Sequence, residues 1–99
     1  MGIYDFVVFR IRELCKERGI TPNGLSYSSG ISQSTIKSIL GGESKNPGIV
    51  TLKKICDGLD ISVIDFFNTA EFHKLDQEIK WHLKSLKAAF YFLNQVKTG

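Results

Sequence analysis

Four polar residues in a six-residue stretch have the side chains and the spacing to read the edge of a nucleic-acid base. They are Gln33, Ser34, Lys37 and Ser38. Glutamine can pair bidentately with adenine, whereas serine and lysine can donate hydrogen bonds to base edges or to phosphates. Helical spacing places these residues opposite the apolar residues Ile36, Ile39 and Leu40. A solvent-exposed face of any helix has a similar composition, so the four residues alone leave both interpretations open.

Two short predicted helices and a glycine turn position this polar face. Thr21 can cap the first helix, and Pro22 suits the first helical position, where no N–H is needed. Gly30 can take the left-handed conformation that ends a helix, and Ser32 can cap the second helix, residues 33–40. This order is the helix-turn-helix pattern, whose second helix can enter the major groove of DNA. An ordinary corner between two helices would carry the same local signals.

Amphipathic segments on both sides of this pair predict further helices. Apolar residues recur every three or four positions in three segments, which are residues 4–18, 49–59 and 70–96. Ser62 can cap one more short helix. Its apolar residues are expected to close the core, and they are Ile64, Phe66 and Phe67. The predicted fold class is therefore all-α.

The overall composition restricts the classes of function. A chain of 99 residues with 42% hydrophobic residues suits one compact domain with an appendage. No apolar run approaches the roughly 18 residues of a membrane span, so we expect a cytoplasmic protein with no membrane partner. The net charge of +3 permits nucleic-acid binding but is too small to argue for it.

No pattern of catalytic or metal-binding residues is recognisable in the sequence. Cys15 and Cys56 lie in separate predicted helices without a CxxC motif, and they are expected to be buried structural thiols. The two histidines, His73 and His82, lie far along the chain. There is no pairing of a nucleophile with a base and no glycine-rich phosphate loop after a strand. We therefore expect no metal, no cofactor and no enzymatic activity.

The arrangement of these features over about residues 7–68 resembles the Cro/Xre family of lambda-repressor-like DNA-binding domains. The resemblance is carried by the segments TPNGLSYSSGISQSTIKSILGGESKNP and TLKKICDGLDISVIDFF. The residues in register with the family pattern are Thr21, Leu25, Gly30, Ser32, Thr35, Ile36, Gly42, Pro47, Leu52, Ile55, Leu59 and Phe67. The resemblance implies a five-helix helix-turn-helix domain in residues 1–68. The apolar periodicity of the remaining residues, 69–99, predicts a long C-terminal helix.

Carried over by position, the resemblance implies which residues contact double-stranded DNA. Base edges would be contacted by Gln33, Ser34, Lys37 and Ser38. Phosphates would be contacted, through side chains or the N–H groups at helix starts, by Thr21, Asn23, Ser32, Thr35, Ser44, Lys45 and Asn46. Pro22 replaces a glutamine that is common in the family, and Asn23 can substitute for it. Cys15 and Leu40 replace a partly buried ion pair of several phage repressors, and we expect them to contact each other.

The segment beyond residue 69 is not explained by this resemblance. Its apolar residues recur in a heptad-like pattern and form a predicted dimerisation stripe of Phe72, Leu75, Ile79, Leu83, Leu86, Phe90 and Leu93. The stripe can pack on Tyr4, Phe6 and Phe9 of its own domain, or on the same helix of a second subunit. A homodimer is the favoured interpretation, because helix-turn-helix dimers read two half-sites.

Together these features predict a sequence-specific transcriptional regulator that binds double-stranded DNA. It is expected to be a repressor that occludes a promoter as a homodimer. The alternative is an antitoxin-like or switch protein whose C-terminal helix binds another protein, with DNA binding secondary.

Overall fold

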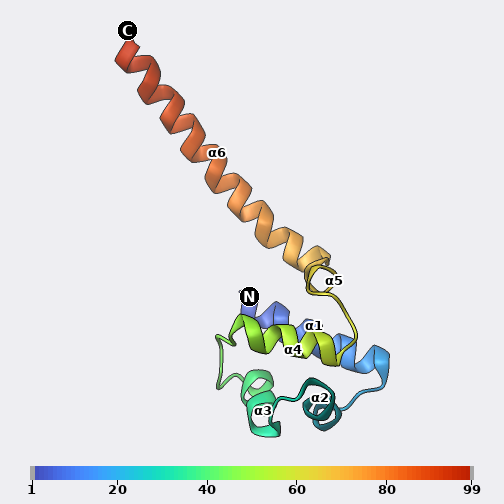
Figure 1. The fold of residues 1–99 in the computed structure, drawn as a ribbon. Coiled ribbons are helices and arrows are strands. Elements are labelled where there is room, and N and C mark those ends of the chain that lie inside the picture. Colours follow the sequence, from blue (N-terminus) through green and yellow to red (C-terminus); the bar gives the residue numbers. More distant parts are fainter. Residues whose placement is uncertain (1, 99) are drawn as a thin grey trace. The chain divides into compact units, whose positions relative to one another are not determined.

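The computed structural model describes residues 2–98, and the side chains of residues 77–85 and 94–98 lie outside that description. Within this range the chain forms six helices and no strand (Figure 1). The helices are α1 (Ile3–Arg18), α2 (Pro22–Ser29), α3 (Gln33–Gly41), α4 (Ile49–Gly58), α5 (Val63–Phe67) and α6 (Ala70–Thr98). The predicted all-α fold is confirmed. The chain divides into two compact units, Met1–Thr69 and Ala70–Gly99.

The helix starts in the first unit follow from local hydrogen bonds. The side-chain oxygens of Thr21, Ser32 and Ser62 each accept a hydrogen bond from a backbone N–H three residues later, at 3.0, 3.2 and 3.0 Å. These contacts satisfy N–H groups that have no partner inside a helix. The turn between α2 and α3 is made by Gly30, whose φ of 73° is left-handed. The predicted caps and turn of the helix pair are therefore present.

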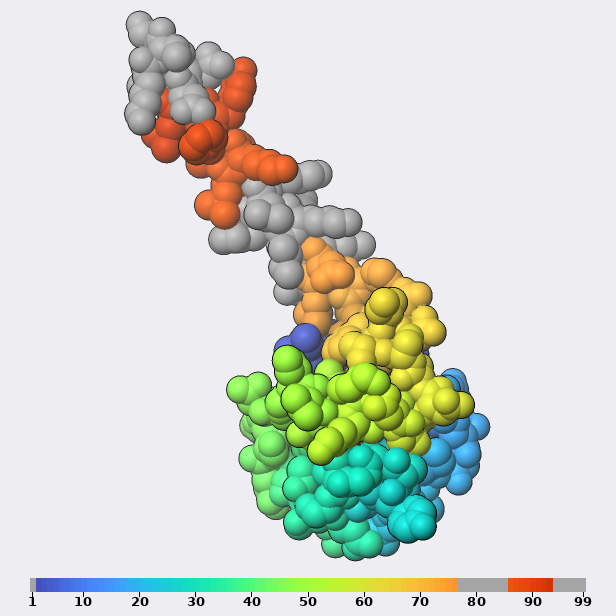
Figure 2. Space-filling model, viewed as in Figure 1, coloured from blue at the N-terminus to red at the C-terminus, as the bar shows by residue number. Residues whose placement is uncertain are grey.

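The core of the first unit is formed by apolar side chains from five helices. The largest fully buried side chains are Ile11, Leu14, Leu25, Ile36, Ile39, Ile55, Cys56, Leu59 and Phe66. Helix α2 packs against both α3 and α4. Figure 2 shows the cyan atoms of α2 lying directly against the yellow-green atoms of α4. Helix α4 thus supports the helix pair by packing against α2.

Helix α1 holds the ends of two other helices through its polar side chains. The last carbonyl groups of a helix have no partner within it. Near the end of α3, the Tyr4 hydroxyl donates to the carbonyl of Ile39. At α5, Arg10 donates to the carbonyls of Phe66 and Asp65, at 2.9 and 3.0 Å. The bond from Tyr4 to Ile39 helps to fix the orientation of α3. This matters for function because α3 is the helix predicted to read DNA.

One predicted core residue lies at the surface. Ile64 has 81% of its surface exposed, whereas Phe66 is fully buried. Ile64 and Phe66 are two positions apart, which separates them by about 200° around the helix axis. They therefore cannot share one buried face of the short helix α5. The prediction for Ile64 was wrong for this reason, and that for Phe66 was correct.

Gly58, the last residue of α4, lies close to Ser29 at the end of α2. A Cβ added at this position would lie 2.9 Å from the Cβ and from the backbone nitrogen of Ser29. We therefore expect Gly58→Ala to lower the free energy of unfolding by about 1–2 kcal/mol, although alanine is the better helix former. Gly41→Ala is a matched control, because Gly41 also ends a helix and a Cβ there meets nothing within 4 Å. Urea unfolding of both variants tests this, and equal stability changes would contradict it.

The two cysteines are free and buried, as predicted. Burial raises the pKa of the Cys15 thiol above its ordinary value of 9.0, against a smaller opposite effect of Arg12. Burial, and then the Asp57 carboxylate, raise the pKa of the Cys56 thiol. In the unfolded chain both thiols lose their protons at lower pH than in the folded chain.

This difference predicts how stability depends on pH. Above pH 9 the unfolded state binds fewer protons than the folded state, so the free energy of unfolding should fall as pH rises. The same measurement on a Cys15→Ala, Cys56→Ala variant should show a shallower fall, because the other titrating groups are unchanged. Urea unfolding between pH 8 and pH 10.5 gives both slopes. Identical slopes in the two proteins would refute the assignment to the thiols.

The second unit consists of the single helix α6, of 29 residues. Among the predicted dimerisation residues, Phe72 is buried and Leu75 is half-buried. Those with exposed side chains are Leu86, Phe90 and Leu93. Ile79 and Leu83 belong to the side chains outside the description. In the part of the chain that the structure describes, no helix combines the length and the apolarity that a membrane crossing requires.

Candidate nucleic-acid interface

Helix α3 separates its buried side chains from its polar ones as the sequence predicted. Ile36 and Ile39 are almost fully buried in the core. Gln33, Ser34 and Lys37 are exposed. The apolar side therefore fixes the helix in the core, where α3 packs against α2, and the opposite side offers amide, hydroxyl and ammonium groups to a ligand. We call Gln33, Ser34 and Lys37 the recognition face.

Ser38 differs from the other three predicted base-contacting residues. It is half-buried, and its hydroxyl donates to a carboxylate oxygen of Glu43 at 3.4 Å. The backbone N–H of Ser44 donates to the Ser38 carbonyl at 2.9 Å, which holds the loop after α3 against the helix end. The Glu43 carboxylate thus places an acidic group beside the last residue of this polar helix face. Ser38 is therefore a weaker candidate for contact with DNA.

The starts of α2 and α3 carry backbone N–H groups that have no partner within their helix. At α3, Ser32 accepts from the N–H of Thr35, and its hydroxyl donates to Thr35 Oγ1 at 2.9 Å. This capping pattern leaves the first N–H groups of α3, those of Gln33 and Ser34, without a partner inside the helix. At α2 the corresponding group belongs to Asn23, since Pro22 has no N–H. Such N–H groups bind phosphates well, because the start of a helix carries partial positive charge.

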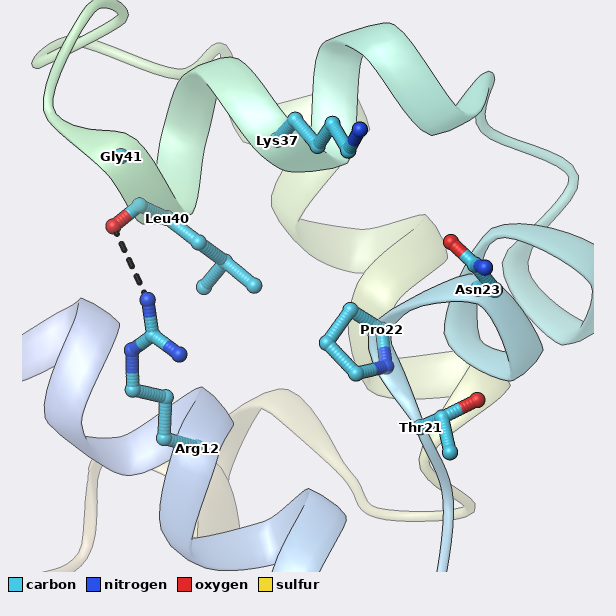
Figure 3. A pocket seen from close by; sticks show the side chains of 7 residues that line it. All are labelled: Arg12, Thr21, Pro22, Asn23, Lys37, Leu40 and Gly41. Carbon is cyan, nitrogen blue, oxygen red and sulfur yellow. Dashed lines mark hydrogen bonds between the residues drawn. The ribbon is translucent and has the colours of Figure 1, made fainter.

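A hollow of about 420 Å³ brings several of the predicted DNA-contacting residues together (Figure 3). It is lined by Arg12, Thr21, Pro22, Asn23, Lys37, Leu40 and Gly41. Thr21 and Asn23 come from the start of α2, and Lys37 belongs to the recognition face of α3. The hollow thus joins a predicted phosphate-contacting region to a predicted base-contacting residue.

Arg12 is the residue of this hollow that the sequence interpretation missed as a DNA contact. Its guanidinium donates from Nη2 to the carbonyl of Leu40 at 3.2 Å, as the dashed line in Figure 3 shows. Arg12 lies one helical turn before Cys15, which the sequence predicts to lie near Leu40. This i, i+3 spacing could have indicated that Arg12 also lies near the end of α3. Cys15 is buried and Leu40 is half-buried. Their direct contact remains a prediction.

The loop of residues 44–46 is placed apart from this hollow. Lys45 and Asn46 are exposed, and they line a second hollow of about 240 Å³. The other residues of that second hollow are Ile3, Tyr4, Val7, Pro47, Ile49, Leu52 and Phe67. The predicted phosphate contacts therefore fall into three groups, at the start of α2, at the start of α3 and in the loop after α3.

Two capped helices around a left-handed glycine, with the apolar side of the second buried and its polar side exposed, define a helix-turn-helix DNA-binding domain. Residues 10–71 match the Cro/C1-type HTH DNA-binding domain, and the chain belongs to that family. This confirms the resemblance found in the sequence. The chain is therefore a DNA-binding transcription regulator.

Several solved structures are similar to this chain. The prophage Lp1 protein 11 is 35% identical, with a TM-score of 0.65 over 72% of this chain and 93% of its own. The wild-type restriction-modification controller protein C.Esp1396I is 29% identical, with a TM-score of 0.62 over 68% of this chain and 86% of its own. A SinR protein/SinI protein complex shares the fold at 24% identity and a TM-score of 0.56, over 94% of this chain and 99% of that chain. No curated protein matches the sequence.

Proposed function

We propose that this chain represses transcription by binding a specific double-stranded DNA sequence as a homodimer. The observation that carries the proposal is the recognition face, because Gln33, Ser34 and Lys37 are exposed on a helix whose other side is buried. Amide and ammonium groups on such a helix can distinguish base pairs in the major groove. Bound at a promoter, the protein would exclude the transcription machinery. No catalytic activity and no cofactor are part of this proposal.

Phosphate contacts on both sides of the recognition face would hold it in register on the duplex. Thr21 and Asn23 lie at the start of α2, and Lys45 and Asn46 lie in the loop after α3. Contacts to phosphates position a protein on DNA without reading its sequence. The regulatory role is supported by the similarity to C.Esp1396I, which is named as a controller protein.

The homodimer is supported by the exposed apolar residues of α6. Leu86, Phe90 and Leu93 are spaced by four and three residues, which places them on one side of the helix. Each of these residues has more than half of its surface exposed. Burying this side against a second copy would link two recognition helices in one protein, and helix-turn-helix dimers read two half-sites about 34 Å apart.

Selection of binding sites from a random pool of duplexes tests the proposed function. We expect a defined sequence to be enriched, in a two-fold repeated arrangement. Its affinity should fall steeply with salt, while the preference over unrelated duplexes remains. No enrichment, together with no binding to any duplex at low salt, would refute the proposal. Enrichment of a single unrepeated site would refute the homodimer.

A further inference from the structure

Arg12 has a guanidinium group that the protein itself uses only in part. Of its five N–H donors, one is directed at the carbonyl of Leu40. The carboxylate next to it in sequence, Glu13, is bound by Arg10 Nη1 at 2.7 Å. Among the described residues, neither Arg12 nor Lys37 takes part in an ion pair. Two positive charges therefore border the same hollow without a neutralising carboxylate.

The hollow has the chemistry of a phosphate-binding site. Besides the two cations it is lined by the polar residues Thr21 and Asn23, and it has no acidic residue in its wall. A guanidinium is suited to phosphate, because its planar set of donors can form two parallel hydrogen bonds to phosphate oxygens. In Figure 3 the Arg12 side chain rises from α1 at one edge of the hollow, and Pro22 and Asn23 lie across it.

The location of the hollow points to the phosphate of a DNA backbone. Lys37 belongs both to the wall of the hollow and to the recognition face. A phosphate bound there would therefore lie next to the bases that Gln33 and Ser34 are proposed to read. From this geometry we infer that Arg12 is a further DNA-binding residue, which contacts a backbone phosphate in the hollow shared with Thr21, Asn23 and Lys37. This inference rests on the proposed function and adds a residue of α1 to its interface.

The hydrogen bond from Arg12 to Leu40 links the proposed phosphate contact to the end of α3. Leu40 lies in the last turn of α3, where a nearby cation is favourable because the end of a helix carries partial negative charge. Arg12 thus joins α1, the end of the recognition helix and the phosphate in one hydrogen-bonded chain. Phosphate binding in the hollow and the orientation of α3 are coupled through this side chain.

The test compares Arg12→Gln with Arg18→Gln in the full chain, on the selected duplex and on an unrelated one. Arg18 is a matched control, because it also lies on α1 and loses the same charge, but it pairs with Glu17 and does not line the hollow. For Arg12→Gln we expect about tenfold weaker binding to both duplexes and a salt slope smaller by about 0.9. For Arg18→Gln we expect the wild-type slope. Arg12→Lys should keep the slope and recover part of the affinity.

Each other outcome has a definite meaning. If the DNA affinity of Arg12→Gln depends on salt as steeply as that of the wild type, the inference is overturned. If this variant also has a lower thermal stability, the role of Arg12 is purely structural. An equal loss in both variants also overturns it, since a general charge effect would then explain the result. If the wild-type chain binds no selected duplex, the proposed function fails and the inference fails with it. If the wild type binds specifically and only the Arg12 result is negative, the proposed function remains.

Discussion

A chain that ends after Asp76 is expected to bind a duplex with two half-sites about 10²- to 10⁴-fold more weakly than the full chain. The truncation removes the exposed residues Leu86, Phe90 and Leu93 and keeps the buried Phe72. In a dimer, binding of one recognition helix holds the second at a high effective concentration near its half-site. Two separate monomers lack this advantage, because the second one must bind from solution. Sedimentation gives the oligomeric state, and fluorescence anisotropy on labelled duplexes gives the affinity. On a duplex with a single half-site, the two chains should bind about equally.

A pair of full-length variants separates the dimer contact from general loss of apolar surface. In the first, Leu86, Phe90 and Leu93 are changed to serine. In the second, Tyr91 and Phe92 are changed to serine. Tyr91 and Phe92 lie off the heptad-like pattern and are as exposed as Phe90, at 66%, 67% and 66%. We expect the first variant to be monomeric and the second to stay dimeric. If the truncated chain stays dimeric, the tail serves another purpose, and the alternative of a different protein partner gains support.

The helices of this fold could be predicted because their boundaries depend on local chemistry. Thr21, Ser32 and Ser62 each cap the helix that follows, within three residues of the N–H that they accept from. Gly30 ends α2 through a backbone conformation that other residues rarely adopt. The division of α3 into buried and exposed sides follows from the 3.6-residue period. All of these signals act over a few residues and can be read from the chain itself.

The parts that could not be predicted depend on contacts between residues far apart in the sequence. Arg12 meets Leu40 across 28 positions, and Tyr4 meets Ile39 across 35. Which polar residue of α1 reaches the end of α3 depends on how the two helices pack, and their separate patterns do not specify that. The Ser38–Glu43 contact is nearer in sequence, but it depends on how the loop after α3 folds back. For this reason the sequence predicted which side chains of α3 are exposed, but it did not predict the Glu43 carboxylate beside Ser38 or the Arg12 guanidinium beside Leu40.

The second large effect concerns base preference, and we expect it from Gln33→Ala. Gln33 is the first residue of α3 and is exposed. The first residues of a recognition helix are those that reach base edges most directly. A bidentate contact of glutamine with adenine discriminates against other bases by about 1–3 kcal/mol. The variant should therefore lose about 5- to 150-fold of its preference at one base pair of each half-site, while its salt slope stays close to that of the wild type.

Lys45→Ala is the control for Gln33→Ala, because it should lower affinity without changing base preference. Lys45 is exposed in the loop after α3, and a phosphate contact from it carries no sequence information. Its removal should weaken binding to all duplexes by a similar factor and reduce the salt slope by about 0.9. Competition between the selected duplex and single-base variants of it measures preference, and a salt titration measures the slope. A Gln33→Ala protein with an unchanged order of preference would show that α3 reads DNA through other residues, or that specificity comes from the shape of the duplex.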